Sequence, residues 1–303
     1  MARRVLLIDD DRLQERIVRQ YLAKLQGEGF ALEWAATYEE GLTRLLGGEF
    51  AACLLDYQLG PRNGLDLLRE AVAAGCRIPI VFLTAETSEK VDIEAMNAGA
   101  HDYLVKGEIN PRTLERSLRY AMKLGATLEA LRNLATHDQL TGLLNRREFD
   151  RVLGEEVERA RRFDRSLGLI LADVDHFKRI NDTLGHLIGD EVLREVARRL
   201  QTQVRSVDRV MRYGGEEFAV LLMETDYQAS SDVAQRIVAN MAQTPVVLAD
   251  QRSIEVRLSA GVAVQPIDAE DGMALVAAAD KALYAAKAGG RNRAVLFRNL
   301  AER

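Results

Sequence analysis

The stretch Arg212-Tyr213-Gly214-Gly215-Glu216-Glu217-Phe218 decides how the second half of this chain is interpreted. Short apolar runs that favour β-strands flank it, residues 207–211 before it and residues 219–222 after it. The two glycines therefore predict the tip of a hairpin, because glycine permits positive φ and a close approach of a ligand to the main chain. Adjacent carboxylates at such a tip repel each other, and a divalent cation relieves that repulsion. Taken alone, the stretch is more typical of a solvated hairpin with an acidic tip than of a metal site.

Further motifs surround this hairpin in a fixed order. An apolar run, residues 166–172, leads into Asp173-Val174-Asp175-His176-Phe177-Lys178. The other motifs are Asp138-Gln139-Leu140-Thr141-Gly142-Leu143-Leu144-Asn145-Arg146-Arg147, Asn181-Asp182, Gly185-His186, Gly189-Asp190 and Lys287 with Gly290-Arg291-Asn292. Together they resemble the GGDEF domain of diguanylate cyclases, here in a GGEEF form, over roughly residues 138–293. The resemblance implies an α+β domain similar to the palm of nucleotidyl cyclases and polymerases, and we expect it over residues 138–298 with a tail at 299–303.

The resemblance implies that two GTP molecules condense to cyclic di-GMP and two pyrophosphates. Each 3′-hydroxyl attacks the α-phosphate of the other nucleotide, so positioning and charge neutralisation carry most of the rate. Two Mg²⁺ ions are expected at the GTP site. The implied metal ligands are Asp173, the carbonyl of Val174, and Glu216. Glu217 is expected either at the second metal or as the acceptor of the 3′-hydroxyl proton.

Substrate contacts are carried over from the same family. Asn181 and Asp190 match the guanine-reading pair, since an amide and a carboxylate satisfy guanine groups that adenine lacks. His186 is either a nucleotide contact or a packing histidine. The residues expected at the phosphates and ribose are Phe177, Lys178, Gly214, Gly215, Lys287 and Arg291. Lys287 and Arg291 are expected on one face of a final helix, where without the resemblance they also fit a solvated surface.

Arg205-Ser206-Val207-Asp208 matches the inhibitory RxxD site of this family, where the cyclic di-GMP product binds. Arginine suits a phosphate or a guanine edge, and aspartate accepts from guanine. Arg236 is a weaker candidate for the second arginine of the site. A surface salt bridge along a strand is the alternative interpretation.

The first half of the chain alternates apolar strands with amphipathic helices. The expected strands are residues 5–8, 32–35, 51–55, 80–83 and 103–105. This alternation predicts a doubly wound, five-stranded parallel sheet whose ligands bind at the carboxyl ends of the strands. The residues at those ends are Asp9, Asp10, Asp11, Asp56, Thr84 and Lys106. Carboxylates from two adjacent strand ends can hold one Mg²⁺ beside a phosphoryl group, which a lysine and a hydroxyl neutralise and hydrogen-bond.

This arrangement resembles a response-regulator receiver domain, expected over residues 1–124. The resemblance implies that Asp56 accepts a phosphoryl group from a histidine kinase. It also implies one Mg²⁺, held by Asp9, Asp10, Asp56 and the carbonyl of Gln58. Thr84 and Tyr103 match the switch pair, and Lys106 matches the phosphate-contacting lysine. The family usually has proline after that lysine and this chain has Gly107, which leaves the shape of that loop open.

A helix is predicted from Pro111 to about His137, with proline at its first turn. Its heptad seam comprises Ser117, Ala121, Leu124, Leu128, Leu131 and Ala135. The first turns are expected to pack on the receiver domain. Beyond Gly125 the helix is expected to have left it, so we predict a linker at residues 125–137 that forms a parallel homodimeric coiled coil. Gly125 is a candidate point for bending or a change of register.

Composition restricts the remaining function classes. The chain has 303 residues, 48% of them hydrophobic, and a formal charge of −5, so nothing predicts nucleic-acid binding or attraction to an anionic membrane. No apolar run reaches the roughly 20 residues that span a bilayer. Cys53 and Cys76 have no metal-ligand spacing and are expected to be buried. We expect a cytoplasmic protein with no signal peptide and no phosphodiesterase domain after residue 293.

These motifs lead to one hypothesis and one main alternative. The hypothesis is a diguanylate cyclase that is activated by phosphorylation, depends on a homodimer and is inhibited by its product. A phosphoryl group at Asp56 adds about −1.5 to −2 charge, which favours pairing of receiver domains and brings two GTP-bound domains face to face. The alternative is a response regulator that senses GTP or cyclic di-GMP without catalysis. A response regulator whose output is protein–protein contact through the coiled coil alone would leave the catalytic motifs unexplained.

Overall fold

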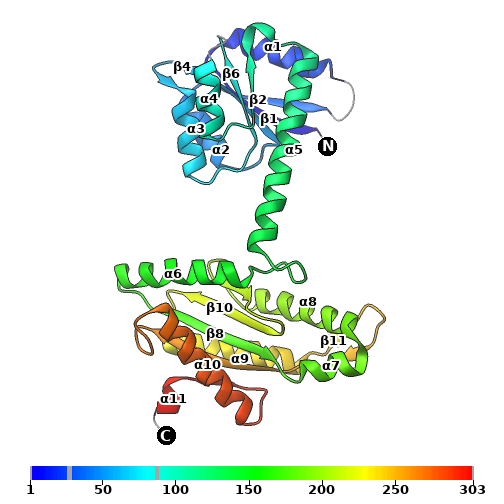
Figure 1. Ribbon diagram of the computed structural model, residues 1–303, viewed down its shortest axis with the longest axis vertical. Helices are drawn as coiled ribbons and strands as arrows, with labels where there is room; N and C mark the ends of the chain where they lie inside the picture. Colours follow the sequence, from blue (N-terminus) through cyan, green and yellow to red (C-terminus); the bar gives the residue numbers. More distant parts are fainter. Residues whose placement is uncertain (1, 26–28, 86–88, 302–303) are drawn as a thin grey trace. The chain divides into compact units, whose positions relative to one another are not determined.

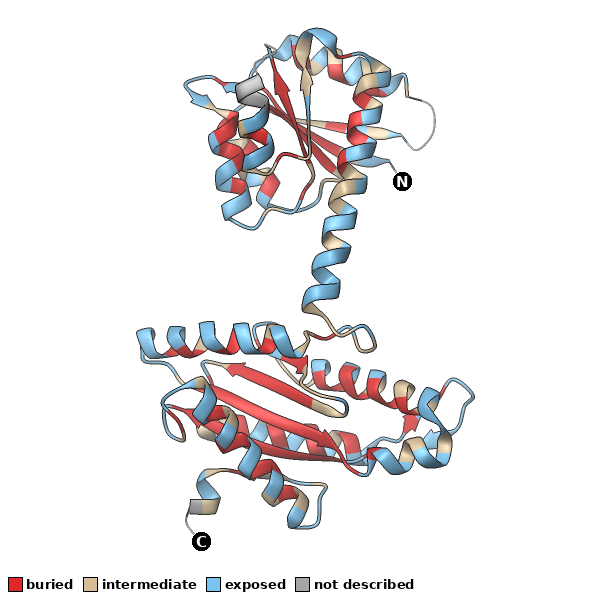
Figure 2. Cartoon of the chain, viewed as in Figure 1, coloured by how far each residue is buried: buried red, intermediate tan, exposed pale blue. Residues whose placement is uncertain are grey.

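The computed structural model describes residues 2–25, 29–85 and 89–301, and its contacts divide the chain into two units, Met1–Arg132 and Asn133–Arg303. Each unit has its own sheet and its own hydrophobic core (Figures 1 and 2). The division falls inside the predicted linker, residues 125–137. The helix was expected to leave the first unit at Gly125, but it keeps contacts with that unit for about one more turn. In the described part of the chain, no helix combines the length and hydrophobicity needed to cross a bilayer.

The first unit is a parallel five-stranded sheet in the order β2-β1-β3-β6-β7. Its strands are β1 Arg3–Ile8, β2 Phe30–Ala35, β3 Ala52–Asp56, β6 Ile80–Thr84 and β7 Asp102–Val105. Its helices are α1 Arg12–Ala23, α2 Tyr38–Leu46, α3 Gly64–Ala73, α4 Glu89–Ala98 and the start of α5 Pro111–Thr136. A small hairpin, β4 Gln58–Leu59 with β5 Arg62–Asn63, follows β3, and a 3-10 turn at Lys106–Glu108 follows β7. The predicted strands and the doubly wound topology are confirmed.

Alternation along the strands builds a core on each face of this sheet. Leu6 and Ile8 belong to the core that α2, α3 and α4 cover, while Val5 and Leu7 belong to the core that α1 and α5 cover. Successive side chains of a strand point to opposite faces, so one apolar run supplies both cores. Because the strands are parallel, their carboxyl ends meet at one edge of the sheet, where the acidic residues follow them.

Helix α5 has two different halves. Its first turns bury Leu114, Ser117, Leu118 and Ala121 against the sheet, whereas Leu128 is 40% exposed and Leu131 is 56% exposed (Figure 2). The expectation that the helix leaves the receiver domain beyond Gly125 is wrong by about one turn. Glu129 forms a 2.8 Å ion pair with Arg77, and a Cβ at position 125 would lie 2.5 Å from Pro79. Gly125 is therefore required for close contact, because any side chain there would meet the proline.

The second unit has a mixed sheet in the order β14-β13-β8-β10-β9, in which only the β13–β14 pair is parallel. The strands are β8 Leu167–Val174, β9 Arg209–Arg212, β10 Glu217–Met223, β13 Leu258–Gln265 and β14 Ala294–Leu296. The helices are α6 Arg146–Phe163, α7 Phe177–Leu184, α8 His186–Thr202, α9 Tyr227–Gln243, α10 Gly272–Ala288 and α11 Arg298–Ala301, and a short hairpin joins β11 Val246–Val247 to β12 Ser253–Ile254. Part of the expected tail is thus the helix α11.

Alternation again supplies two cores. Ile170 and Ala172 of β8 pack with the side chains of α8 and α9, whereas Leu169 and Leu171 pack with those of α6 and α10. The sheet is consequently covered on both faces, and β8 at its centre is buried over its whole length. This rigid central strand carries Asp173 near its end.

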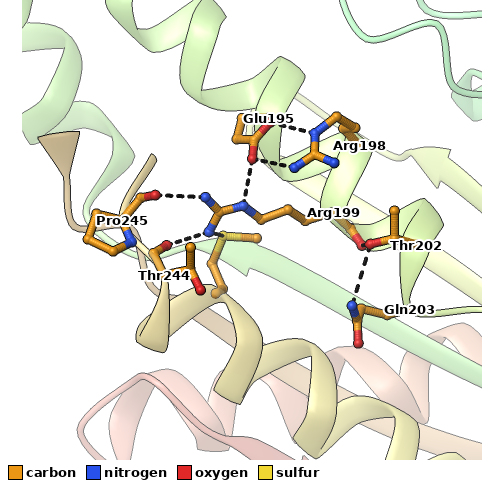
Figure 3. Close-up of polar contacts among 8 residues, drawn as sticks. Glu195, Arg198, Arg199, Thr202, Gln203, Thr244 and Pro245 are labelled. Atoms are coloured by element: carbon orange, nitrogen blue, oxygen red, sulfur yellow. Dashed lines mark hydrogen bonds and ion pairs between the residues drawn. The ribbon is translucent and has the colours of Figure 1, made fainter. Parts of the chain in front are cut away.

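A buried arginine joins α8 to the segment after α9 (Figure 3). The Arg199 guanidinium donates to Glu195 at 2.7 Å, to the Pro245 carbonyl at 2.8 Å and to the Thr244 carbonyl. Arg198 shares the Glu195 carboxylate but is exposed. Hydrogen bonds from Arg198, and then from Arg199, lower the pKa of Glu195 to about 2.

We predict that Arg199→Leu destabilises the second unit by about 3 kcal/mol, because it leaves two carbonyls and a carboxylate without their buried donor. Hydrogen exchange of the α8 and α9 amides in the full chain measures this loss. Arg198→Leu removes the exposed partner of the same carboxylate and is expected to cost at most about 1 kcal/mol. Equal losses in the two variants would contradict the buried role of Arg199.

The same contacts predict acid sensitivity. The pKa of Glu195 is lower in the folded state than the ordinary value of 4.5, so its stabilisation is present above about pH 4.5 and is lost as pH falls toward 2. The stability difference between wild type and Arg199→Leu should therefore shrink between pH 5 and pH 2.

Candidate functional site

The predicted hairpin is present, but its glycines act differently from the expectation. Strands β9 and β10 pair antiparallel, and the amides of Tyr213 and Gly214 both donate to the Glu217 carbonyl, at 2.8 and 3.1 Å. Neither Gly214 nor Gly215 has positive φ, so that part of the prediction is wrong. Gly214 instead leaves room for the Glu217 side chain, because a Cβ there would lie 2.6 Å from a carboxylate oxygen of Glu217, which would have to shift.

Arg212 holds the hairpin tip, a role that the sequence did not reveal. Its guanidinium donates to the Gly215 carbonyl, the shorter contact being 2.6 Å, and to both carboxylate oxygens of Asp138 at 3.0 Å. Asp138 also accepts from the amide and hydroxyl of Thr141. Burial alone would raise the pKa of Asp138, but the donors Thr141 and Arg212 hold that pKa below its usual value. One guanidinium thus connects the turn that begins the second unit with the tip of the acidic hairpin.

A buried carboxylate faces this tip. Asp173 lies opposite Glu217 across β8 and β10, is 6% exposed, and accepts an ion pair from Lys287 of α10 at 2.7 Å. Burial raises the pKa of Asp173, and the Lys287 hydrogen bond opposes that rise. Burial also raises the pKa of Glu216, and the neighbouring Asp173 charge adds to it. Two carboxylates that raise each other's proton affinity form a strong site for a cation.

These residues fit a divalent metal. Asp173 and Glu216 supply hard oxygen donors, and the Val174 amide donates to the Glu216 carbonyl at 3.2 Å, which keeps the two segments together. Among the described residues, only Asp9, Asp10 and Asp56 bring three carboxylate oxygens within 4.8 Å of one another. A metal at the hairpin would therefore use two side chains together with main-chain or substrate oxygens.

The predicted guanine-reading residues lie on two consecutive helices. Asn181 belongs to α7 and Asp190 to α8, and Gly189 lets the helices approach, because a Cβ there would lie 1.9 Å from Asn181 Oδ1. Asn181 Oδ1 is buried and has no hydrogen-bond partner in the structure. A buried amide oxygen without a donor costs free energy, and guanine N–H groups would supply one. His186 is exposed, which removes the packing interpretation for it.

The structure limits how two of the expected phosphate contacts could be made. The Phe177 side chain is 6% exposed and belongs to the hydrophobic core, so only its main chain, at the first residue of α7, is available to a phosphate. Arg291 does not lie on the final helix, because α10 ends at Ala288 and Arg291 has φ of 63° in the loop beyond it. Lys178 is exposed in the first turn of α7, as a phosphate contact requires.

Arg205, Asp208 and Arg236 line one cavity of about 460 Å³. Arg205 and Arg236 are exposed, and Arg236 donates to the Gln203 carbonyl at 2.6 Å. Asp208 is buried, and its two oxygens accept from the amides of Arg205 and Met223 at 2.9 and 3.0 Å. Asp208 is therefore first of all the anchor of its own turn.

The first unit gathers its predicted residues at the carboxyl ends of β1, β3 and β7. Lys106 forms ion pairs with Asp9 at 2.9 Å and with Asp56 at 2.8 Å. Asp10 accepts from the Gly60 amide at 2.9 Å, which brings the small hairpin that contains Gln58 close to the carboxylates. Gly107 lies in a 3-10 turn that begins with Lys106, so the missing proline does not displace the lysine. The carboxylates fit a hard divalent cation.

The remaining predicted residues of this unit differ in burial. Thr84, at the end of β6, is 3% exposed, whereas Tyr103 of β7 is 40% exposed. Trp34, which the sequence did not single out, donates its indole N–H to the Asp9 carbonyl at 2.7 Å. It fixes the main chain beside the acidic residues. Of the two cysteines, Cys53 is buried and Cys76 is only partly buried.

Comparison with known proteins identifies both units. Residues 135–293, more than half of the chain, match the family model described as diguanylate cyclase, GGDEF domain. This chain belongs to the GGDEF diguanylate cyclase family. Residues 5–119 match the response regulator receiver domain, so the GGDEF domain follows a receiver domain. Both resemblances that the sequence motifs indicated are confirmed.

The relatives of this GGDEF protein include well-described regulators. Response regulator PleD of Caulobacter vibrioides is 36% identical over 227 residues, which cover 72% of this chain and 50% of PleD. Diguanylate cyclase DosC of Escherichia coli is 40% identical over 173 residues, 56% of this chain and 37% of DosC. The chain thus spans half or less of the length of these relatives. Among solved structures, the coiled coil and GGDEF domain of DgcB from Caulobacter crescentus, in complex with c-di-GMP, has a TM-score of 0.57 and 32% identity, covering 61% of this chain and 97% of that one.

Burial of Asp56 leads to a prediction about stability in the absence of metal. Burial raises the pKa of Asp56 to about 6, and the hydrogen bond from Lys106 opposes this rise. Because this folded-state pKa lies above the unfolded value, the contribution of Asp56 to the free energy of unfolding is fully present below pH 4 and is lost as pH rises through 6. Asp56→Asn should therefore stabilise the receiver unit by about 1–3 kcal/mol at pH 7.5 in EDTA. The gain should disappear near pH 4.

The measurement is hydrogen exchange of the β3 and β6 amides in the full chain across this pH range. Asp11→Asn is the matched control, because Asp11 caps α1 from an exposed position and asparagine caps equally well. A gain that persists unchanged at pH 4, or that Asp11→Asn reproduces, would contradict the role of Asp56 burial.

Proposed function

We propose that this chain is a diguanylate cyclase that condenses two GTP molecules to cyclic di-GMP and two pyrophosphates. The observation that carries the proposal is the buried Asp173, which faces the acidic hairpin tip and pairs with Lys287 at 2.7 Å. In each half of the reaction a bond forms between a 3′-oxygen and an α-phosphorus, and the bond from that phosphorus to the bridging oxygen of pyrophosphate breaks. Two Mg²⁺ ions would activate the attacking hydroxyl and neutralise the leaving pyrophosphate.

The residues of this chain have separate tasks in the proposal. Asp173, Glu216 and the Val174 carbonyl hold metal, and Glu217 serves the second metal or accepts the 3′-hydroxyl proton. Asn181 and Asp190 bind the guanine, and the buried, partnerless Asn181 Oδ1 supports this assignment. Lys178, Lys287 and Arg291 bind the triphosphate, with the ribose close to Gly214 and Gly215. His186, exposed at the start of α8, is a further nucleotide contact.

We further propose a homodimer, because one domain supplies one nucleotide and the product has two-fold symmetry. The exposed leucines of α5, Leu128 and Leu131, support a parallel coiled coil between two copies. A phosphoryl group transferred from a histidine kinase to Asp56 would contact Mg²⁺, Thr84 and Lys106, and Tyr103 would respond as the second switch residue. The receiver domains would then pair and bring the catalytic domains together.

The first test is cyclic di-GMP formation from GTP and Mg²⁺ by the full chain, after bound product is removed, with and without beryllofluoride. We expect turnover, a rise with beryllofluoride, and a loss of at least about 100-fold in Glu216→Gln, because the substitution removes a charged metal ligand while keeping its shape. Glu158→Gln, an exposed change on α6, should not alter turnover.

Several results would contradict parts of this proposal. Tight GTP or cyclic di-GMP binding without synthesis in either state would favour a sensor instead of an enzyme. If beryllofluoride changes neither the rate of synthesis nor the association state measured by light scattering, the proposed activation through Asp56 is wrong.

Product inhibition is a separate part of the proposal. Arg205 and Arg236 line a cavity of about 460 Å³ and are exposed to a ligand, and cyclic di-GMP bound there would limit synthesis. Arg205→Ala should raise the final product yield and weaken inhibition at least tenfold, since a charged hydrogen bond is lost. The affinity for a non-hydrolysable GTP analogue should stay unchanged. Progress curves with added product measure the effect, with Arg161→Ala on α6 as an exposed control. Unchanged inhibition would contradict the assignment.

A further inference from the structure

Asp175 is a buried carboxylate that the proposed reaction does not use. It lies two residues after Asp173 and is 7% exposed. One oxygen accepts the hydroxyl of the fully buried Ser259 at 2.7 Å, and the other accepts the amide of Asn292 at 2.9 Å. The Asp175 amide donates to the Arg257 carbonyl at 2.9 Å. The spacing Asp-x-Asp at a strand end suggests a pair of metal ligands, but both oxygens of the second aspartate already have protein donors.

The segment that Asp175 holds is conformationally costly. Gly290, Arg291 and Asn292 have φ values of 111°, 63° and 48°, so three consecutive residues lie in the left-handed region. Residues other than glycine adopt this region only when their surroundings enforce it. The Arg291 amide donates back to the Ala286 carbonyl of α10 at 3.0 Å, which fixes one end of the turn. The bond from Asn292 to Asp175 fixes the turn to the end of β8.

This turn carries Arg291 next to Asn292, whose amide is bonded to Asp175, two residues after Asp173. Burial has the largest effect on the pKa of Asp173 and raises it, and the positive charges of Lys287 and Arg291 oppose that rise. Lys287, from the end of α10 just before the turn, forms the ion pair with Asp173. Both cations are thus placed by the same segment. Asp173 and Asp175 have different roles. Asp173 faces the proposed metal position, and Asp175 holds the loop that carries Arg291.

We propose that Asp175 is a positioning residue that fixes the turn at residues 290–292, so that Arg291 faces the triphosphate of the bound nucleotide. This proposal rests on GTP being the ligand of the domain, but it does not require that the domain cyclise GTP. Asp175 acts through Arg291 and is not a third metal ligand.

Two substitutions at Asp175 separate positioning from metal binding. In Asp175→Asn the amide oxygen can still accept the Asn292 N–H, and the NH₂ group can donate to the Ser259 hydroxyl. We therefore expect the KM for GTP to stay within about threefold of wild type, with an unchanged Mg²⁺ requirement. Asp175→Ala removes both bonds and should raise, at least tenfold, both the KM and the Kd for a non-hydrolysable GTP analogue. Its kcat at saturating GTP should change little.

A double-mutant cycle tests the route through Arg291. Arg291→Ala should weaken analogue binding as much as Asp175→Ala does, and the double variant should be no weaker than either single variant. Asp268→Ala is the matched control, because Asp268 likewise accepts a main-chain amide, that of Val264 at 2.8 Å. Val264 lies near the other end of β13 from Ser259, which contacts Asp175. It should lower thermal stability without changing analogue affinity.

The outcomes distinguish this proposal from the proposed reaction. If Asp175→Asn loses as much as Asp175→Ala and needs more Mg²⁺, Asp175 is a metal ligand and the positioning role is wrong. Additive losses in the cycle would also overturn it. If wild type binds the analogue but forms no cyclic di-GMP, the proposed reaction fails, while coupled losses in the cycle would still establish the role of Asp175.

Discussion

Each unit of this protein depends on buried carboxylates that one lysine neutralises only in part. In the receiver domain, Lys106 reaches both Asp9 and Asp56, and in the GGDEF domain Lys287 reaches Asp173. Burial raises the pKa of all three carboxylates, so the lysines do not fully offset the loss of water. Such sites cost stability in the free protein and gain it when a cation binds. The folds hold these carboxylates at the ends of buried strands, where the chain cannot move away to relieve the strain.

The acidic hairpin shows how a correct structural prediction can rest on the wrong cause. Two glycines between apolar runs predict a tight turn, and the turn is present. Its shape, however, depends on Arg212, whose guanidinium holds both the Gly215 carbonyl and Asp138. Neither glycine has positive φ, and only Gly214 leaves space for the Glu217 carboxylate. A contact between residues 74 positions apart has no periodic or local signal, so it could not be inferred from the sequence.

Elements with a strong local pattern could be predicted from the sequence, and those defined by tertiary contacts could not. The five parallel strands, the helix from Pro111 and the grouping of Asp9, Asp56 and Lys106 follow from alternation and from the rule for strand ends. Three details at chain turns were missed. Helical spacing placed Arg291 on α10, but the helix ends at Ala288, before Arg291 is reached. The burial of the Phe177 side chain was not predicted, because motif position does not report which face of a helix is buried. The motifs gave Asp175 no role, and its structural role is visible only in its hydrogen bonds to Ser259 and Asn292.

The segment from Arg205 to Asp208, proposed above as an inhibitory site, offers the same distinction between anchor and ligand contact. Asp208 accepts from the amides of Arg205 and Met223, so it joins the turn before β9 to the end of β10. These are the two strands that carry the acidic hairpin. A ligand that engages Arg205 and Arg236 would therefore act on a turn that is already fixed to the hairpin strands, and it would not need Asp208 as its main contact. Because Asp208 is buried and holds main-chain donors on both oxygens, replacing it would disturb the hairpin itself. The side chain of Arg205 is exposed, and it is the Arg205 main-chain amide that bonds to Asp208. Arg205 is therefore the residue at which the proposed binding of product can be tested without disturbing the acidic hairpin.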